Sequence, residues 1–111
     1  MREIKFRCFG KNSKEFLQDK KGYGLTLKEL QNVADLDSWE ISQSTGLLDK
    51  NGKEIWEGDI VKFGNSIGEI KWEDFGWVIV IKEFTSIELW QFNGNEEVIG
   101  NIYETPELLK S

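Results

Sequence analysis

The chain has 111 residues, enough for one domain with its own core. Hydrophobic residues make up 39% and aromatic residues 13%, including five Trp and seven Phe, so we expect an ordered fold whose core contains large rings. The net charge of −6 disfavours sequence-independent nucleic-acid binding. Because the sequence has no His and only one Cys, it excludes Ser/His and Cys/His dyads, an intramolecular disulfide and a multi-cysteine zinc site.

The charge is unevenly distributed along the chain. Residues 1–30 carry eight basic and four acidic side chains, a net charge of +4, whereas residues 31–111 carry six and sixteen, a net charge of −10. Solvated faces of opposite sign are the ordinary explanation. The alternative is that the basic N-terminal residues dock on an acidic body, either of the same chain or of a neighbour.

The first third of the sequence predicts a strand, a short partner strand and a helix. Residues 2–9 alternate as in a half-buried strand. One face is apolar and the other charged: Ile4, Phe6 and Cys8 against Glu3, Lys5 and Arg7. In this phase Cys8 is a small buried side chain rather than a reactive thiol. Residues 15–18 would pair with this strand, and the capping-box spacing of Thr26 and Glu29 predicts a helix over residues 27–35.

Two chain reversals are predicted between residues 45 and 63. Asp49, Asn51 and Gly52 supply the acceptor and the positive-φ residue that a tight turn needs, so residues 46–48 and 53–56 should form a hairpin. A calcium loop explains this turn less well, because its Gly stands at the sixth position and here it comes fourth. We assign structural roles in these turns, and at the start of a final helical turn, to Gly46, Asp49, Asn51, Gly52, Gly58, Asp59 and Pro106.

The remaining pattern is that of a mainly β protein. Further strands are predicted at residues 39–45, 60–63, 68–72, 77–82, 87–92 and 97–103. This spacing is typical of a small antiparallel barrel or meander, with one short helix near residues 27–35 and a short C-terminal helical turn. Residues 78–81 are apolar throughout, so we expect them in the central strand. The chain is interpreted as a single domain, 1–111, in which residues 1–38 pack on a β-rich body, 39–111.

Carboxylates are the only abundant catalytic side chains. Those near the predicted turns are Glu54, Glu57, Asp59, Glu73 and Asp74. Two of them could act as an acid and base pair, but solvated turn carboxylates are the expected explanation. The sequence contains no phosphate-binding glycine loop. We therefore predict no catalytic, cofactor-binding or metal-binding residues, and no cofactor.

The tryptophans are the remaining candidates for function. Trp39 and Trp56 are in phase with apolar neighbours and should be in the core. Trp72, Trp77 and Trp90 form the candidate interaction surface, because exposed indoles anchor protein interfaces or stack on nucleobases. This half of the chain is acidic, so we favour a protein partner over nucleic acid.

One stretch carries a family resemblance: Thr45-Gly-Leu-Leu-Asp-Lys-Asn-Gly-Lys-Glu-Ile-Trp-Glu-Gly-Asp-Ile-Val61. It resembles the signature of the YopX-like family of small phage and prophage proteins, although Trp56 stands where the family often has Tyr. Residues 2–7 and 97–109 are similar to the family's first strand and C-terminal signature. The resemblance implies a β-rich fold with an SH3-like barrel, a virus-derived intracellular origin and self-association, and it brings no catalytic residues.

Together these features predict a non-enzymatic phage accessory protein in the bacterial cytoplasm. It would bind another protein or assemble with itself, and no membrane partner is expected because the sequence has neither a signal peptide nor an apolar run that spans a bilayer. The alternative is a nucleic-acid-binding small-barrel module, by analogy of fold alone. A carboxylate-dependent hydrolase is a weaker third hypothesis.

Overall fold

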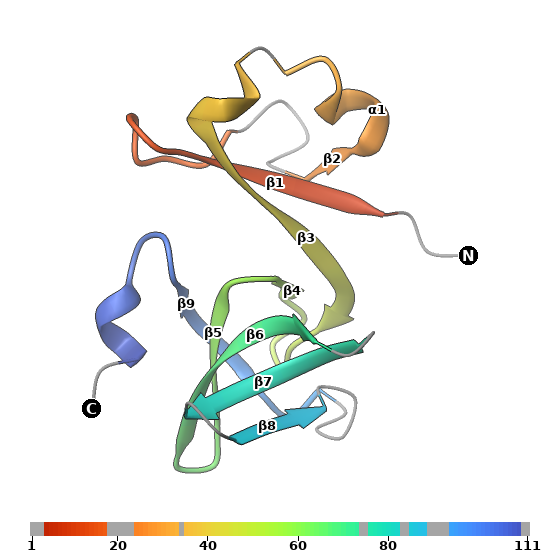
Figure 1. Cartoon of the computed structure of the whole chain (residues 1–111). Helices are drawn as coiled ribbons and strands as arrows, with labels where there is room; N and C mark the ends of the chain where they lie inside the picture. Colours follow the sequence, from red (N-terminus) through yellow and green to blue (C-terminus); the bar gives the residue numbers. More distant parts are fainter. Residues whose placement is uncertain are drawn as a thin grey trace.

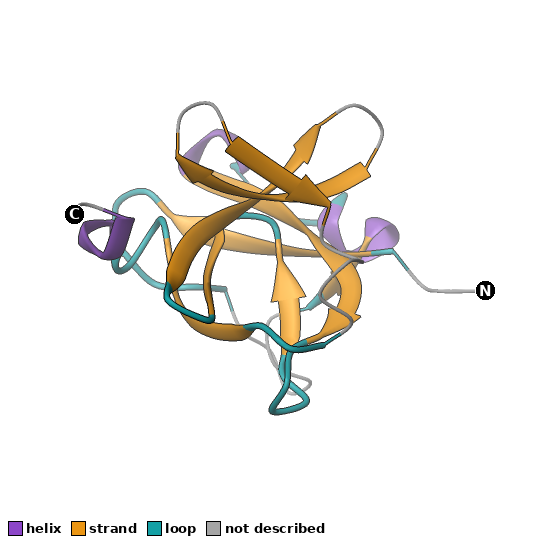
Figure 2. Cartoon of the chain, turned by 90° about the horizontal axis from the view of Figure 1, so that it is seen from below, coloured by secondary structure: helices purple, strands orange, loops and turns teal. Residues whose placement is uncertain are grey.

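The computed structural model describes residues 4–17, 24–33, 35–73, 76–82, 85–88 and 94–109, without the side chains of 36, 82, 85, 86 and 88. Within these segments the chain forms two antiparallel sheets, and neither closes into a barrel (Figure 1). The strands fill the centre of the molecule and the helical turns lie at its periphery (Figure 2). The predicted β-rich fold is therefore confirmed, with a meander rather than a barrel. None of the helices in the described segments is long and apolar enough to cross a membrane.

The first sheet has four strands in the order β2-β1-β3-β4. Its strands are β1 (Lys5–Gly10), β2 (Leu25–Thr26), β3 (Trp39–Leu48) and β4 (Glu54–Trp56). Of the strand predicted at residues 15–18, residue 18 lies outside the described residues, and among residues 15–17 only Phe16 forms a bridge, with Phe9. Two residues of β2 pair with β1 instead, which the sequence pattern did not predict.

The predicted helix is confirmed at its start but is much shorter than expected. Thr26 and Glu29 form the capping box, yet α1 spans only Leu27–Leu30. Asp35 adopts a left-handed backbone conformation with φ +59°, which an α-helix does not accommodate. A 3₁₀ turn, η1 (Leu36–Ser38), then leads directly into β3.

The second sheet has five strands in the order β8-β7-β6-β5-β9. They are β5 (Asp59–Phe63), β6 (Ser66–Glu73), β7 (Gly76–Lys82), β8 (Thr85–Glu88) and β9 (Glu97–Asn101). Strands β5 to β8 form a meander, and β9 returns to pair with β5. The strand predicted to be central, β7, is an interior strand, while β6 occupies the centre. The C-terminal turn is a 3₁₀ helix, η3 (Pro106–Leu109), which begins at the predicted proline.

The hydrophobic core lies between β4 and one face of the five-stranded sheet. Its fully buried members are Ile55, Val61, Ile70 and Ile79, and the half-buried Leu47, Phe63, Trp77 and Val98 pack against them. Trp56 is buried as predicted. Trp39 is only half-buried, so its placement in the core was wrong.

Candidate functional site

The alternation predicted for β1 fails at Arg7. The strand was expected to turn Arg7 toward solvent, but Arg7 is 2% exposed, while Ile4, on the predicted inner face, is exposed. In Figure 1, α1 and β2 lie beside the start of β1, where Lys5 and Phe6 pair with β2. The residues from Arg7 to Gly10 are all buried, so both faces of β1 are covered from Arg7 onward. An apolar residue in the charged phase, Phe9, was the signal in the sequence that this face is also buried.

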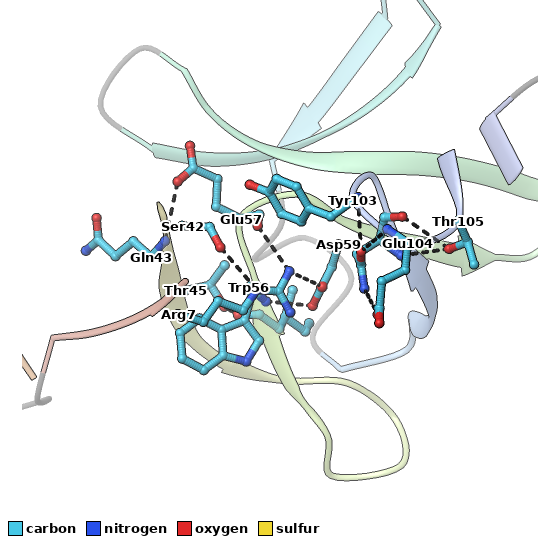
Figure 3. Close-up of polar contacts among 12 residues, drawn as sticks. Arg7, Ser42, Gln43, Thr45, Trp56, Glu57, Asp59, Tyr103, Glu104 and Thr105 are labelled. Carbon is cyan, nitrogen blue, oxygen red and sulfur yellow. Dashed lines mark hydrogen bonds and ion pairs between the residues drawn. The ribbon is translucent and has the colours of Figure 1, made fainter. Parts of the chain in front are cut away.

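Arg7 joins the two sheets through a buried ion pair. Its Nη2 lies 2.7 Å from Asp59 Oδ1, and both side chains are almost fully buried. The same nitrogen donates to the carbonyl oxygen of Glu57 at 3.3 Å, and Nε donates to Ser42 Oγ at 3.1 Å (Figure 3). Residues of β1, β3 and the β4–β5 turn thus converge on one guanidinium group. Such an arrangement recovers part of the large desolvation cost of the two charges.

Aromatic rings enclose this ion pair. The Arg7 guanidinium carbon lies 4.6 Å from the ring centroid of Phe16, 5.4 Å from that of Trp56 and 6.0 Å from that of Tyr103. Tyr103 stacks on Phe9 with ring centroids 5.3 Å apart. Guanidinium groups are attracted to the faces of aromatic rings, and this attraction strengthens where water is excluded.

The β4–β5 turn holds Asp59 in place. Gly58 has a φ of +88°, its N–H donates to Ile70 O at 2.9 Å, and its carbonyl accepts the Ile102 N–H at 2.9 Å. The positive φ favours glycine at this position, and a Cβ atom would also crowd the Tyr103 ring at 3.2 Å. The other oxygen of Asp59, Oδ2, accepts the Trp56 N–H at 2.8 Å.

The prediction of solvated turn carboxylates was wrong for Asp59. Burial raises the pKa of its carboxyl group, and the charge and hydrogen bond of Arg7, together with the Trp56 amide, oppose that shift. Burial also raises the pKa of Tyr103, against the hydrogen bond with Ser42. Because Arg7 is neutralised within the chain, the cluster joins the layers instead of presenting a free positive charge.

A cavity of about 410 Å³ adjoins the Arg7–Asp59 pair. It is lined by Arg7, Phe16, Lys53, Asp59, residues 98–101, Glu104 and Thr105. Its polar groups are extensively bonded to one another. Asn101 Oδ1 accepts the N–H groups of Tyr103 and Glu104, and its Nδ2 donates to Glu104 Oε1 at 2.9 Å. Thr105 Oγ1 accepts the Asn101 N–H at 3.0 Å.

Asp49 is a second buried turn carboxylate. Its Oδ1 accepts the N–H groups of Asn51 at 2.9 Å and Lys53 at 2.8 Å, and its Oδ2 accepts the Val98 N–H at 2.9 Å. Burial opposes ionisation, but these three amides outweigh it and lower the pKa of Asp49. Gly46 and Gly52 have positive φ values of +77° and +80°, and the antiparallel pairing of β3 with β4 confirms the predicted hairpin.

The other predicted residues are separated from this cluster. Glu54 pairs with Lys5 at 2.8 Å and accepts a hydrogen bond from Ser44, while Glu73 is exposed. Cys8 is fully buried as predicted, and burial raises the pKa of its thiol. In the described parts of the chain, no three Cys, Asp or Glu side chains gather in a way that could hold a metal ion.

The structure describes two of the three tryptophans of the candidate interaction surface, Trp72 and Trp77. Trp72 is 51% exposed, and its ring centroid lies 4.9 Å from that of Trp77 in an edge-to-face contact. Trp77 packs on the core. Trp90 and Asp74 lie outside the described residues.

Several residues at the site were missed in the sequence. Ser42 and Ser44 are buried, while Ile41, next to Ser42, is exposed, which is the reverse of what hydrophobicity suggests for β3. Nothing in the sequence indicated that Tyr103 and Glu96 would be buried, because single polar residues near strand ends are usually solvated. Their burial depends on contacts between segments far apart in the sequence.

Known proteins share this fold over its full length. Protein EF1440 from Enterococcus faecalis is similar with a TM-score of 0.67 and 29% identity, covering 96% of this chain and 98% of its own. The yopX protein from Bacillus subtilis is similar in fold, with a TM-score of 0.59 and 16% identity, covering 99% and 98%. The comparison with curated proteins gives no match. The YopX protein family matches residues 5–110, so this chain belongs to that family.

Proposed function

We propose that this chain is a non-enzymatic module that binds another protein through the end of the β6–β7 hairpin, where Trp72 is exposed. The observation that carries the proposal is the Trp72–Trp77 pair. One indole is half in solvent and the other packs on the core, so the exposed ring is held in place before a partner arrives. A pre-ordered aromatic anchor loses little side-chain entropy on binding.

The surroundings of Trp72 fit a protein interface. Its neighbours in β6, Lys71 and Glu73, are exposed and of opposite charge. An apolar anchor with a polar rim is the usual composition of such an interface. Residues 31–111 carry a net charge of −10, so a partner with a basic surface would be attracted to this half of the chain.

Two basic N-terminal side chains that could contact a partner are already paired within the chain. Lys5 and Arg7, two of the basic N-terminal residues, form ion pairs with Glu54 and Asp59 of the same chain. This favours docking of the basic segment on its own body over docking on a neighbour.

The outer edge of β9 is partly closed as well. The Val98 N–H donates to Asp49 and the Asn101 N–H donates to Thr105, so neither N–H is free to pair with an added strand. This leaves the Trp72 end of the sheet as the better candidate for contact with a partner.

The cavity supports a binding role more than a catalytic one. Of its two carboxylates, Asp59 is held by Arg7 and the Trp56 amide, and Glu104 accepts the amide of Asn101. Neither is poised as a free acid or base. Membership of the YopX family, together with the family resemblance of the sequence, supports the proposal of a phage or prophage accessory protein that acts in the bacterial cytoplasm.

The test compares Trp72→Ala with a control, Leu27→Ala. Leu27 is 56% exposed, close to the 51% of Trp72, and lies on α1, beside the four-stranded sheet. Each tagged variant is used to capture proteins from prophage-bearing bacteria, and the captured proteins are quantified. We expect partners that are retained by the wild type and by Leu27→Ala to be lost by roughly tenfold or more with Trp72→Ala, a typical cost for an interface anchor.

Two further measurements decide between the alternatives. Light scattering on a sizing column shows whether the lost partner is a second copy of the chain. A shift of oligonucleotides at low salt that Trp72→Ala abolishes would replace the protein partner by nucleic acid. Equal capture by all three proteins, with unchanged thermal melting, would refute the role of Trp72.

A further inference from the structure

Glu96 is a buried carboxyl group with an unpartnered oxygen. It is 1% exposed, just before β9, and its Oε2 accepts no hydrogen bond within the described part of the chain. An ionised oxygen without a donor is costly away from water, so the protonated form is favoured. Burial is the largest cause that raises the pKa of Glu96, its own amide opposes the shift, and the nearby Asp49 carboxylate adds to it.

Glu96 sits in a joint between two distant segments. The Lys50 N–H donates to the Glu96 carbonyl oxygen at 2.9 Å, and the Val98 N–H donates to Asp49 Oδ2 at 2.9 Å. These two bonds attach the segment 96–98 to the turn between β3 and β4. Asp49, with three amide donors, has its pKa lowered, whereas the pKa of Glu96, with its unpartnered oxygen, is raised, so Glu96 keeps its proton to a higher pH than Asp49 does.

The two nearby lysines, Lys50 and Lys53, do not offset the burial of the Glu96 carboxyl group. Lys50 Nζ lies 3.6 Å from Glu97 Oε1, and both of these side chains are well exposed. Lys53 is also exposed, and its charge acts on Asp49. Within the described residues, no hydrogen bond runs from either lysine to Glu96 Oε2.

The same joint shapes the cavity beside Arg7 and Asp59. Lys53 and Val98 both line that cavity, and both of their amides are held by the Asp49 carboxylate. Any loosening of the joint therefore moves one wall of the cavity.

We propose that Glu96 is a proton-operated latch. While it is protonated, the segment 96–98 stays closed on the β3–β4 turn; when it ionises, repulsion from Asp49 loosens the joint and the cavity wall formed by Lys53 and Val98. A carboxyl group that binds its proton more tightly in the folded state contributes stability at low pH, and this contribution is lost as the pH rises through the folded-state value. The latch therefore opens toward higher pH.

The test is hydrogen exchange of the Lys50 and Val98 amides by NMR in the whole chain, between about pH 4 and pH 8, which covers the range above an ordinary Glu. Rates are expressed as protection relative to an unstructured peptide, which removes the intrinsic dependence of exchange on pH. In the wild type we expect protection to fall by up to roughly tenfold for each pH unit between the ordinary and the folded-state values.

Two variants complete the experiment. Glu96→Gln keeps the size of the side chain and cannot ionise, so its protection should stay constant. Glu97→Gln changes the exposed neighbour and should behave as the wild type. A flat wild-type profile, or a slope that survives in Glu96→Gln, overturns the proposal. If Glu96→Gln does not fold, titration of the Glu96 side-chain carbon in the wild type decides: a midpoint in the ordinary Glu range overturns the latch, and a raised midpoint that coincides with the loss of protection supports it.

Discussion

Two buried aspartates flank β4, and the chain satisfies them in different ways. Asp49 is held by three amide N–H groups, two of them from its own turn, whereas Asp59 is held mainly by Arg7 from a different sheet. Amide dipoles lower the pKa of Asp49, while burial prevails over Arg7 and raises that of Asp59. The first carboxylate therefore fixes a local turn, and the second joins the two layers of the molecule.

The largest effect should come from Asp59→Ala, because it leaves Arg7 buried with no opposite charge. Removing one partner of a buried ion pair costs about 3–5 kcal/mol. We expect the free energy of unfolding, measured by urea denaturation, to fall by that amount. The variant also leaves the Trp56 N–H without its acceptor.

A double variant separates the charge from the shape of the site. Replacing both partners, by Arg7→Met with Asp59→Asn, removes the uncompensated charge and keeps an acceptor near Trp56. Its loss of stability should be smaller than that of Asp59→Ala, since apolar replacements of buried pairs are often nearly neutral. If Asp59→Ala alone lowers the free energy of unfolding by less than about 1 kcal/mol, the burial of Arg7 does not depend on its ion pair with Asp59.

Asp49→Ala should have a smaller effect, because the groups that it leaves unpaired are amides rather than a buried cation. Unsatisfied buried donors cost about 1–3 kcal/mol, and water can reach the exposed Asn51 and Lys53. The effect should also depend on pH. Since the folded-state pKa of Asp49 is lowered from 3.8, its contribution is present above that value and is lost as the pH falls below it.

Urea denaturation of Asp49→Ala and Asp49→Asn at neutral and acid pH checks this expectation. For both variants the difference from the wild type should become smaller as the pH drops, because the part that depends on ionised Asp49 is lost. If the difference grows in acid instead, the three amide bonds are not what keeps Asp49 ionised.

The sequence predicted the local features of the fold well and the contacts between layers poorly. Turn residues such as Gly52 and Gly58, the capping box and most strands were predicted correctly because backbone conformation and alternation are local properties. The burial of Arg7 was not predicted, since it requires Asp59, Ser42 and Tyr103 to meet from distant parts of the chain. Sequence periodicity shows that a strand has two faces, but it does not show what covers each of them.

The smallest effect is expected at Gly52, in the turn that Asp49 organises. Gly52 has a φ of +80°, and a Cβ atom there would meet nothing within 4 Å, so only the backbone conformation opposes a side chain. Gly52→Val should cost about 1–2 kcal/mol, because a branched side chain is strained in the left-handed region. Gly52→Asn is the matched control, since Asn tolerates this conformation. Urea denaturation should therefore rank the wild type first, then Gly52→Asn, then Gly52→Val. Equal losses for the two variants would mean that the turn is limited by something other than φ, and an unchanged Gly52→Val would show that the hairpin relaxes freely around Asp49.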